Sequence, residues 1–234
     1  MKRRDFLEGL ALTSSALLAA CNAQGAPSLR KLVRRVERTN EELERALYSG
    51  ERTNRVSRDA ALAGDAFPSY FISPTVPVWD PAARGPWRLE VGGAVRRPLS
   101  LSLDDLVAMR GTTQRVDHFC VEGWTARAEF TGVRLSALAG LAEPTPDAGY
   151  VDFQSFDKGY HESWDLESAM HPQTVVAYAV NGHYLNAFQG APARVHSPVK
   201  LGYKNTKYLT RILFMPARNG GYWSDQGYEW YGGT

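Results

Sequence analysis

One cysteine in the middle of the chain stands where it could carry chemistry. Cys120 follows residues 116–119, which alternate in polarity as a strand does, and precedes a loop that contains Gly123. The pattern predicts a strand over 113–120 that places His118 on the same face as Cys120. A cysteine at a strand end is both rigidly held and accessible, so Cys120 is a candidate nucleophile or metal ligand. The alternative is a small buried apolar side chain, as free cysteines commonly are.

A Cys–His nucleophile pair is the other reading of this strand. Neighbouring residues on one strand face lie roughly 6–7 Å apart, so His118 is awkwardly far from Cys120 for proton transfer. A cysteine hydrolase therefore remains an alternative.

A second group of residues has the composition of an anion site. Two segments carry it, Gln189-Gly-Ala-Pro-Ala-Arg194 and Gly202-Tyr-Lys-Asn-Thr-Lys207. Their glycines, Gly190 and Gly202, permit close backbone approach. Their donors are suited to a buried phosphate, and these are Thr206, Arg194, Lys204 and Lys207. The segments could equally form a solvated strand face, and no Walker or dinucleotide fingerprint is present.

The elements that must position these residues are short. Ser102 is expected to cap a helix over 103–109, while 87–91, 175–180 and 207–214 are typical of strands. Asn181-Gly182 predicts a tight hairpin to 183–185. Three prolines in 67–77 favour an extended segment. Strands outnumber helices without regular alternation, which predicts a mixed, strand-rich α+β domain with short helices.

Composition excludes several classes of protein. The chain has 234 residues, with 27 Lys plus Arg against 25 Asp plus Glu, and its two cysteines are Cys21 and Cys120. Two cysteines exclude a disulfide framework, a four-thiolate zinc site and a Cys-ligated iron–sulfur cluster. Nucleic acid is a poor partner because no binding motif is present. Although the net charge is only +2, residues 194–218 contain basic residues and no Asp or Glu. Such a segment is expected to face an anionic partner or solvent.

The N-terminal residues have the pattern of an export signal. A twin-arginine pair at Arg3 and Arg4 precedes the apolar run 9–20, and Leu18-Ala19-Ala20-Cys21 resembles a lipobox. We expect residues 1–20 to be a twin-arginine lipoprotein signal peptide, with a lipid on Cys21 that holds the protein to a membrane on the exported, periplasmic or cell-surface side. A plain secretory signal is the alternative.

A charged segment separates this signal from the rest of the chain. Apolar residues recur at helical spacing from Leu29 to Leu47, so 21–66 is expected to contain an amphipathic helix that acts as a spacer. The helix could also lie on anionic headgroups. Residues 67–234 are then the catalytic domain.

Five blocks of sequence together resemble a known family. In order along the chain they are Cys120-Val-Glu-Gly-Trp124, Thr131-Gly-Val-Arg-Leu-Ser136, Tyr178-Ala-Val-Asn-Gly182, Gly190-Ala-Pro-Ala-Arg194 and Gly202-Tyr-Lys-Asn-Thr-Lys207. Their order and spacing resemble the sulfite oxidase family of molybdopterin oxidoreductases, over roughly 67–234. The layout is closest to the small exported bacterial members that lack a haem domain.

The resemblance assigns roles to individual residues. It implies that Cys120 binds the molybdenum of a Mo-molybdopterin cofactor, because soft thiolates suit such a metal. It further implies that the cofactor is held by Ser155, Gln189, Arg194, Asn205, Thr206 and Lys207. Candidates for the substrate pocket are His118, Trp124, Tyr203, Lys158, Tyr160 and His161.

The implied reaction is oxygen-atom transfer on a small-molecule S-oxide, N-oxide or sulfite-like substrate. Ser73 stands where relatives often have Arg or Asn, so the pocket is expected to be less cationic and to favour a neutral substrate and reduction. The chain lacks a Cys-x-x-Cys-His haem site and a flavin fingerprint, so electrons are expected from an external cytochrome or membrane haem protein. A cofactor-free lipoprotein that serves as a scaffold is the alternative.

Overall fold

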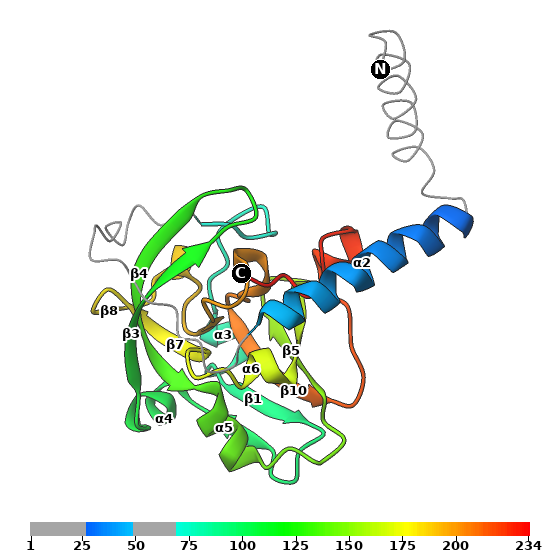
Figure 1. Cartoon of the computed structure of the whole chain (residues 1–234). Helices are drawn as coiled ribbons and strands as arrows, with labels where there is room; N and C mark the ends of the chain where they lie inside the picture. Colours follow the sequence, from blue (N-terminus) through cyan, green and yellow to red (C-terminus); the bar gives the residue numbers. More distant parts are fainter. Residues whose placement is uncertain (1–26, 49–68) are drawn as a thin grey trace, which may run out of the picture. The chain divides into compact units, whose positions relative to one another are not determined.

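The computed structural model describes residues 27–48 and 69–234, which fall into two units (Figure 1). The predicted signal peptide and Cys21 lie outside the described residues. The first unit holds helix α2 (Pro27–Leu47), so the helix expected in the spacer is present. Within the described ranges, no helix combines the length and the apolar character that crossing a bilayer requires.

The second unit is built on two sheets. The first sheet has the strand order β2-β1-β10-β5-β6, in which β1 pairs with β10 in parallel and the other pairs are antiparallel. Its strands are β1 (Leu89–Gly93), β2 (Leu99–Leu101), β5 (Tyr150–Ser155), β6 (His161–Asp165) and β10 (Leu209–Met215).

The second sheet has the order β3-β4-β7-β8, and β9 also pairs with β7. Its strands are β3 (Thr112–Phe119), β4 (Thr125–Arg134), β7 (Val175–Val180), β8 (His183–Tyr184) and β9 (Arg194–His196). Figure 1 shows β3, β4 and β7 along one side of the unit and β1, β10 and β5 along the other. The predicted mixed, strand-rich α+β fold is confirmed.

The helices of this unit are short. They are α3 (Pro81–Arg84), α4 (Leu103–Ala108), α5 (Leu135–Ala142), α6 (Leu166–Ala169) and the 3-10 turns η2 (Ala187–Gln189), η3 (Gly202–Lys204) and η4 (Ser224–Gln226). Helix α4 begins as expected, because the Ser102 hydroxyl accepts from the Asp105 N–H while the Asp105 carboxylate accepts from the Ser102 N–H.

Strand β7 is buried on both faces, which explains its continuous apolar sequence. Val176 contributes to the larger core, which joins both sheets to α4 and α5. Val175 and Ala177 contribute to a smaller cluster around Phe130 on the opposite face, as the period of two along a strand requires. The hairpin after β7 turns at Asn181 and Gly182, whose φ angles are 50° and 81°, as predicted.

Two lysines of the basic run form buried ion pairs. Lys204 Nζ lies 2.6 Å from Glu162 Oε2, with both side chains fully buried, and Lys200 Nζ lies 3.3 Å from Asp165 Oδ2. The expectation that Lys204 donates to a bound phosphate is therefore wrong. A buried ammonium needs a carboxylate partner, and β6 supplies one beside η3.

The aromatic C-terminal segment packs on the same loop. Lys200 Nζ donates to the Tyr231 carbonyl at 2.6 Å, the Leu201 N–H donates to the Gly232 carbonyl at 2.9 Å, and the Tyr203 hydroxyl donates to the Glu229 carbonyl at 2.5 Å. Residues 229–232 thus hold in place the segment that leads into 205–207.

Candidate active site

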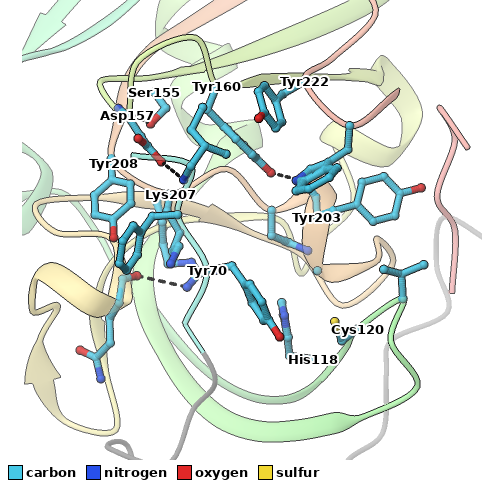
Figure 2. A pocket seen from close by; sticks show the side chains of 18 of the residues that line it. Tyr70, His118, Cys120, Ser155, Asp157, Tyr160, Tyr203, Lys207, Tyr208 and Tyr222 are labelled. Carbon is cyan, nitrogen blue, oxygen red and sulfur yellow. Dashed lines mark hydrogen bonds between the residues drawn. The ribbon is translucent and has the colours of Figure 1, made fainter. Parts of the chain in front are cut away.

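A cavity of about 390 Å³ is enclosed by segments that are far apart in sequence (Figure 2). Nine of the ten residues predicted as catalytic or cofactor-binding line it, namely Cys120, His118, Trp124, Tyr203, Ser155, Gln189, Arg194, Asn205 and Lys207. Thr206 is fully buried beside them but does not line the cavity. Gly202 and Tyr160, which the sequence also indicated, line it as well. The lining further includes residues that the sequence did not single out, namely Tyr70, Phe71, Ile72, Val121, Glu122, Asp157, Phe188, Tyr208, Tyr222, Trp223 and Tyr228.

Cys120 lies directly after β3 at the start of a tight loop. Its N–H donates to the Trp124 carbonyl at 2.9 Å, and the Gly123 N–H donates to the Cys120 carbonyl at 3.0 Å. Gly123 has a φ of 87°, which favours glycine. The Cys120 side chain is partly buried, and burial raises the pKa of its thiol.

The Glu122 carboxylate organises the loop around the thiol. It accepts from the Tyr70 hydroxyl at 2.7 Å and from Trp124 Nε1 at 3.1 Å, and Cys120 Sγ lies 3.9 Å from it. The hydrogen bond from Tyr70 is the main reason that the pKa of Glu122 is lowered. Glu122 is part of the Cys120–Trp124 block, so the sequence contained a signal for it that was not used.

His118 is buried and neutral. Burial, and then the nearby charges of Arg194 and Lys207, lower its pKa to about 3. Its Nδ1 lies 3.3 Å from Nε2 of His196, whose pKa burial likewise lowers. A neutral imidazole held in this way is a poor source of charge for a substrate anion.

Two cations lie in the wall of the cavity without acidic partners. Neither Arg194 nor Lys207 forms an ion pair with a described carboxylate. Arg194 donates to the Gln189 carbonyl, and Lys207 donates to the Phe188 carbonyl and the Ser69 hydroxyl. Burial lowers the pKa of Arg194 to about 10 and that of Lys207 to about 7. Figure 2 shows Lys207 on the side of the cavity away from Cys120.

Two glycines permit the close approach that the sequence predicted. A Cβ on Gly190, whose φ is 99°, would lie 2.7 Å from Lys207 Cβ, and one on Gly202 would lie 2.8 Å from His118 Nε2. Neither contact is tolerable for a real Cβ, so these glycines set the spacing between the loops of the site.

Two of the predicted cofactor residues form hydrogen bonds within the protein that shape their own loops. Asn205 accepts from the Ser197 N–H and donates to the carbonyls of Lys200 and Leu201. Gln189 forms a reciprocal cap with Asn186. These side chains shape the loops.

The extended segment at 70–73 crosses the site because Asp157 pins it. The Asp157 carboxylate accepts from the N–H groups of Ile72, at 2.7 Å, and Ser73, at 3.1 Å, and from the Ser73 hydroxyl. The Ser73 side chain thus helps to fix the position of this segment. Two other pocket candidates lie outside the lining, since Lys158 is exposed and His161 pairs with Asp152 at 2.8 Å.

The family of the chain follows from comparison of its sequence with known protein families. Residues 74–223 match the family described as the oxidoreductase molybdopterin binding domain. The match covers more than half of the chain, so the chain belongs to this family and is a molybdopterin-dependent oxidoreductase of the sulfite oxidase and sulfoxide reductase type.

Curated relatives narrow the class further. The chain is 33% identical over 234 residues to a candidate protein-methionine-sulfoxide reductase subunit, YedZ1, of Azospira oryzae, covering 99% of this chain and 88% of that one. It is 33% identical over 145 residues to the protein-methionine-sulfoxide reductase catalytic subunit MsrP of Ralstonia nicotianae, and 34% identical over 155 residues to MsrP of Xanthomonas axonopodis pv. citri. These matches cover 56% and 60% of this chain but only 44% and 48% of the two catalytic subunits.

A solved structure supports the fold. The sulfane dehydrogenase SoxCD from Paracoccus pantotrophus aligns with a TM-score of 0.53 at 24% identity, over 56% of this chain and 38% of that chain. The cofactor-free scaffold is not favoured by these findings.

The residues present fit an anionic cofactor. Five buried side-chain polar atoms have no hydrogen-bond partner among the described residues, and three of them lie beside the two cations without acidic partners, namely Arg194 Nε, Thr206 Oγ1 and the Tyr208 hydroxyl. Buried polar atoms are normally satisfied, so this cluster indicates a site for a phosphate-bearing group.

An Arg194→Met variant should separate binding of this group from folding. Burying an unpaired guanidinium is costly, so the cofactor-free variant is expected to gain about 1–2 kcal/mol in free energy of unfolding. The same variant from a cofactor-competent host is expected to retain less molybdenum. Denaturant unfolding and metal analysis test both effects; a loss of stability in the cofactor-free form would contradict this account of Arg194.

Proposed function

We propose that this chain reduces methionine sulfoxide in proteins, as the exported, lipid-anchored subunit of a molybdenum enzyme. The names of the relatives support the substrate, and the family supports the cofactor. Cys120 would bind the metal, while Arg194 and Lys207 would hold the cofactor phosphate with help from Thr206.

The distribution of charge in the cavity is the observation that carries this proposal. Arg194 and Lys207 are the only Lys or Arg side chains among the described residues that line it, and Lys207 lies away from Cys120 (Figure 2). The charged side chain nearest the thiol is Glu122, at 3.9 Å. A dianion such as sulfite would be repelled there, whereas a neutral sulfoxide would not.

When bound, the cofactor would supply two-electron oxygen-atom transfer. The residues of this chain would orient the substrate and exclude water. Trp124 is tied to Glu122, and Tyr203 to the C-terminal segment, so both present fixed walls. A preorganised apolar wall suits the methyl and methylene groups of methionine sulfoxide.

Electrons would come from a second protein. The sequence contains no haem or flavin motif, and the relatives are named as subunits. We therefore propose a membrane redox protein as the donor.

The twin-arginine motif and the lipobox support export and a lipid on Cys21. Palmitate labelling that persists in Cys21→Ala would contradict a lipid at that residue.

Activity assays on the purified holoenzyme test the reaction. Oxidation of a reduced viologen dye is expected with methionine sulfoxide and more weakly with dimethyl sulfoxide and trimethylamine N-oxide. Ferricyanide reduction by sulfite is expected to be slower by about tenfold or more, because one unfavourable charge contact of about 1.4 kcal/mol suffices for that factor. Faster turnover of sulfite than of every oxide would overturn the proposal.

A further inference from the structure

Exposed apolar side chains gather at the mouth of the cavity. Seven large apolar residues of the second unit are exposed among the described residues, and four of them line this cavity. These four are Tyr70, Val121, Phe188 and Tyr228, with exposed fractions of 58%, 47%, 57% and 39%, and we call them the apolar rim. A concentration of apolar surface around a site indicates a binding surface, whereas scattered single residues do not.

The rim residues are held in place by their surroundings. Tyr70 donates to Glu122, and the backbone just after it is pinned by Asp157. Tyr228 packs against Trp223 at 5.0 Å and against Tyr203 at 5.4 Å between ring centroids. A fixed apolar surface binds with little loss of conformational freedom.

The Phe188 backbone is fixed as well, because its carbonyl accepts from Lys207 Nζ at 3.2 Å. The apolar rim therefore combines residues from four segments of the chain that the fold brings together. Two of its four residues, Tyr70 and Tyr228, lie outside residues 74–223 that match the family.

The size of the cavity limits what can enter it. A volume of about 390 Å³ lies near the lower end of the range for ligand sites, roughly 300–1,000 Å³. The cofactor would occupy much of this volume. Only a group of side-chain size can then reach Cys120, and anything attached to that group must lie on the rim.

We propose that the apolar rim binds the polypeptide on either side of an oxidised methionine, so that the enzyme prefers sulfoxides flanked by apolar residues. This inference rests on the proposed function. A free small sulfoxide would pass the rim without covering it, whereas apolar neighbours in an unfolded segment would bury it. Apolar residues are exposed mainly where a protein has lost its fold, so the rim would direct the enzyme to damaged, locally unfolded chains.

Two synthetic peptides test the rim with the holoenzyme and a reduced viologen dye, so that no protein donor is needed. Both contain one methionine sulfoxide, flanked by leucines in the first peptide and by glycine and serine in the second. The native enzyme is expected to show a kcat/KM for the first peptide that is about tenfold higher, a size typical of one or two aromatic contacts at an interface. In Tyr228→Ser and Phe188→Ser this ratio is expected to fall to about twofold, mainly through KM.

Tyr184→Ser is the matched control. Tyr184 is an exposed aromatic residue, with an exposed fraction of 64%, that does not line the cavity, so its replacement is expected to leave the ratio unchanged. Molybdenum content is measured for every variant, which shows that the cofactor is retained.

The outcomes are distinct. Equal kcat/KM for the two peptides in the native enzyme, or a ratio that the rim variants preserve, overturns the rim proposal while leaving sulfoxide reduction intact. Rim variants that keep the ratio but slow turnover with a membrane electron donor also overturn it, and assign the rim to that donor. Failure to reduce any sulfoxide overturns the proposed function and the rim together.

Discussion

Cys120→Ser is expected to lose sulfoxide reduction by more than about a hundredfold. A serine oxygen is a harder ligand than a thiolate, and Cys120 is the only cysteine among the described residues. Replacing the ligand itself is expected to lower activity by more than the roughly 10–100-fold that is typical when a residue hydrogen-bonded to a metal ligand is replaced. The measurements are turnover with a reduced dye and molybdenum per protein.

The fold should survive this substitution. The Cys120 side chain is only partly buried and lies against the exposed Glu122, so the unfolding free energy of the cofactor-free protein is expected to change by less than about 0.5 kcal/mol. Turnover within threefold of the native enzyme would refute the assignment of Cys120 as the metal ligand.

Lys204→Met is expected to destabilise the protein by about 3–5 kcal/mol. The substitution leaves the Glu162 carboxylate buried without its ammonium partner, which is the costly way to break such a pair. Glu162 would keep the Trp223 N–H and the Ser224 hydroxyl, at 2.9 and 3.0 Å, but no cation. For a domain of this size the melting temperature should fall by roughly 10 °C.

A double variant identifies the cause. Lys204→Met combined with Glu162→Leu removes both charges and is expected to recover most of the loss, because buried pairs often exchange with apolar residues at little cost. Lys158→Met removes an exposed lysine and serves as the matched control. A double variant no more stable than the single one would show that the pair is not the source.

The local features of the fold could be predicted because nearby residues determine them. The turn at Asn181-Gly182 and the cap at Ser102 each depend on side chains within three positions. That Gly190 and Gly202 permit close approach was also predictable, since glycine has no Cβ, but the residues that approach them, Lys207 and His118, were not. The motif blocks then placed nine of ten predicted site residues around one cavity, although their roles stay predictions.

Long-range pairing explains what could not be predicted. Lys204 and Lys207 look alike in sequence, but only the β5–β6 pairing brings Glu162 to Lys204, 42 positions away. Tyr70 reaches Glu122 because Asp157 holds the proline-rich segment that contains Tyr70. Asp157 lies 85 positions after Ile72, from whose N–H it accepts a hydrogen bond. No local pattern encodes either partner.

The loop from Cys120 to Trp124 is closed by two hydrogen bonds of its own backbone, and the Glu122 carboxylate adds contacts with Tyr70 and Trp124. Val121 and Glu122 are exposed there, beside the reactive sulfur. Residues at these two positions can therefore be exchanged in evolution without disturbing the packed interior. We therefore expect that substitutions at these positions can alter substrate preference without lowering the stability of the two sheets.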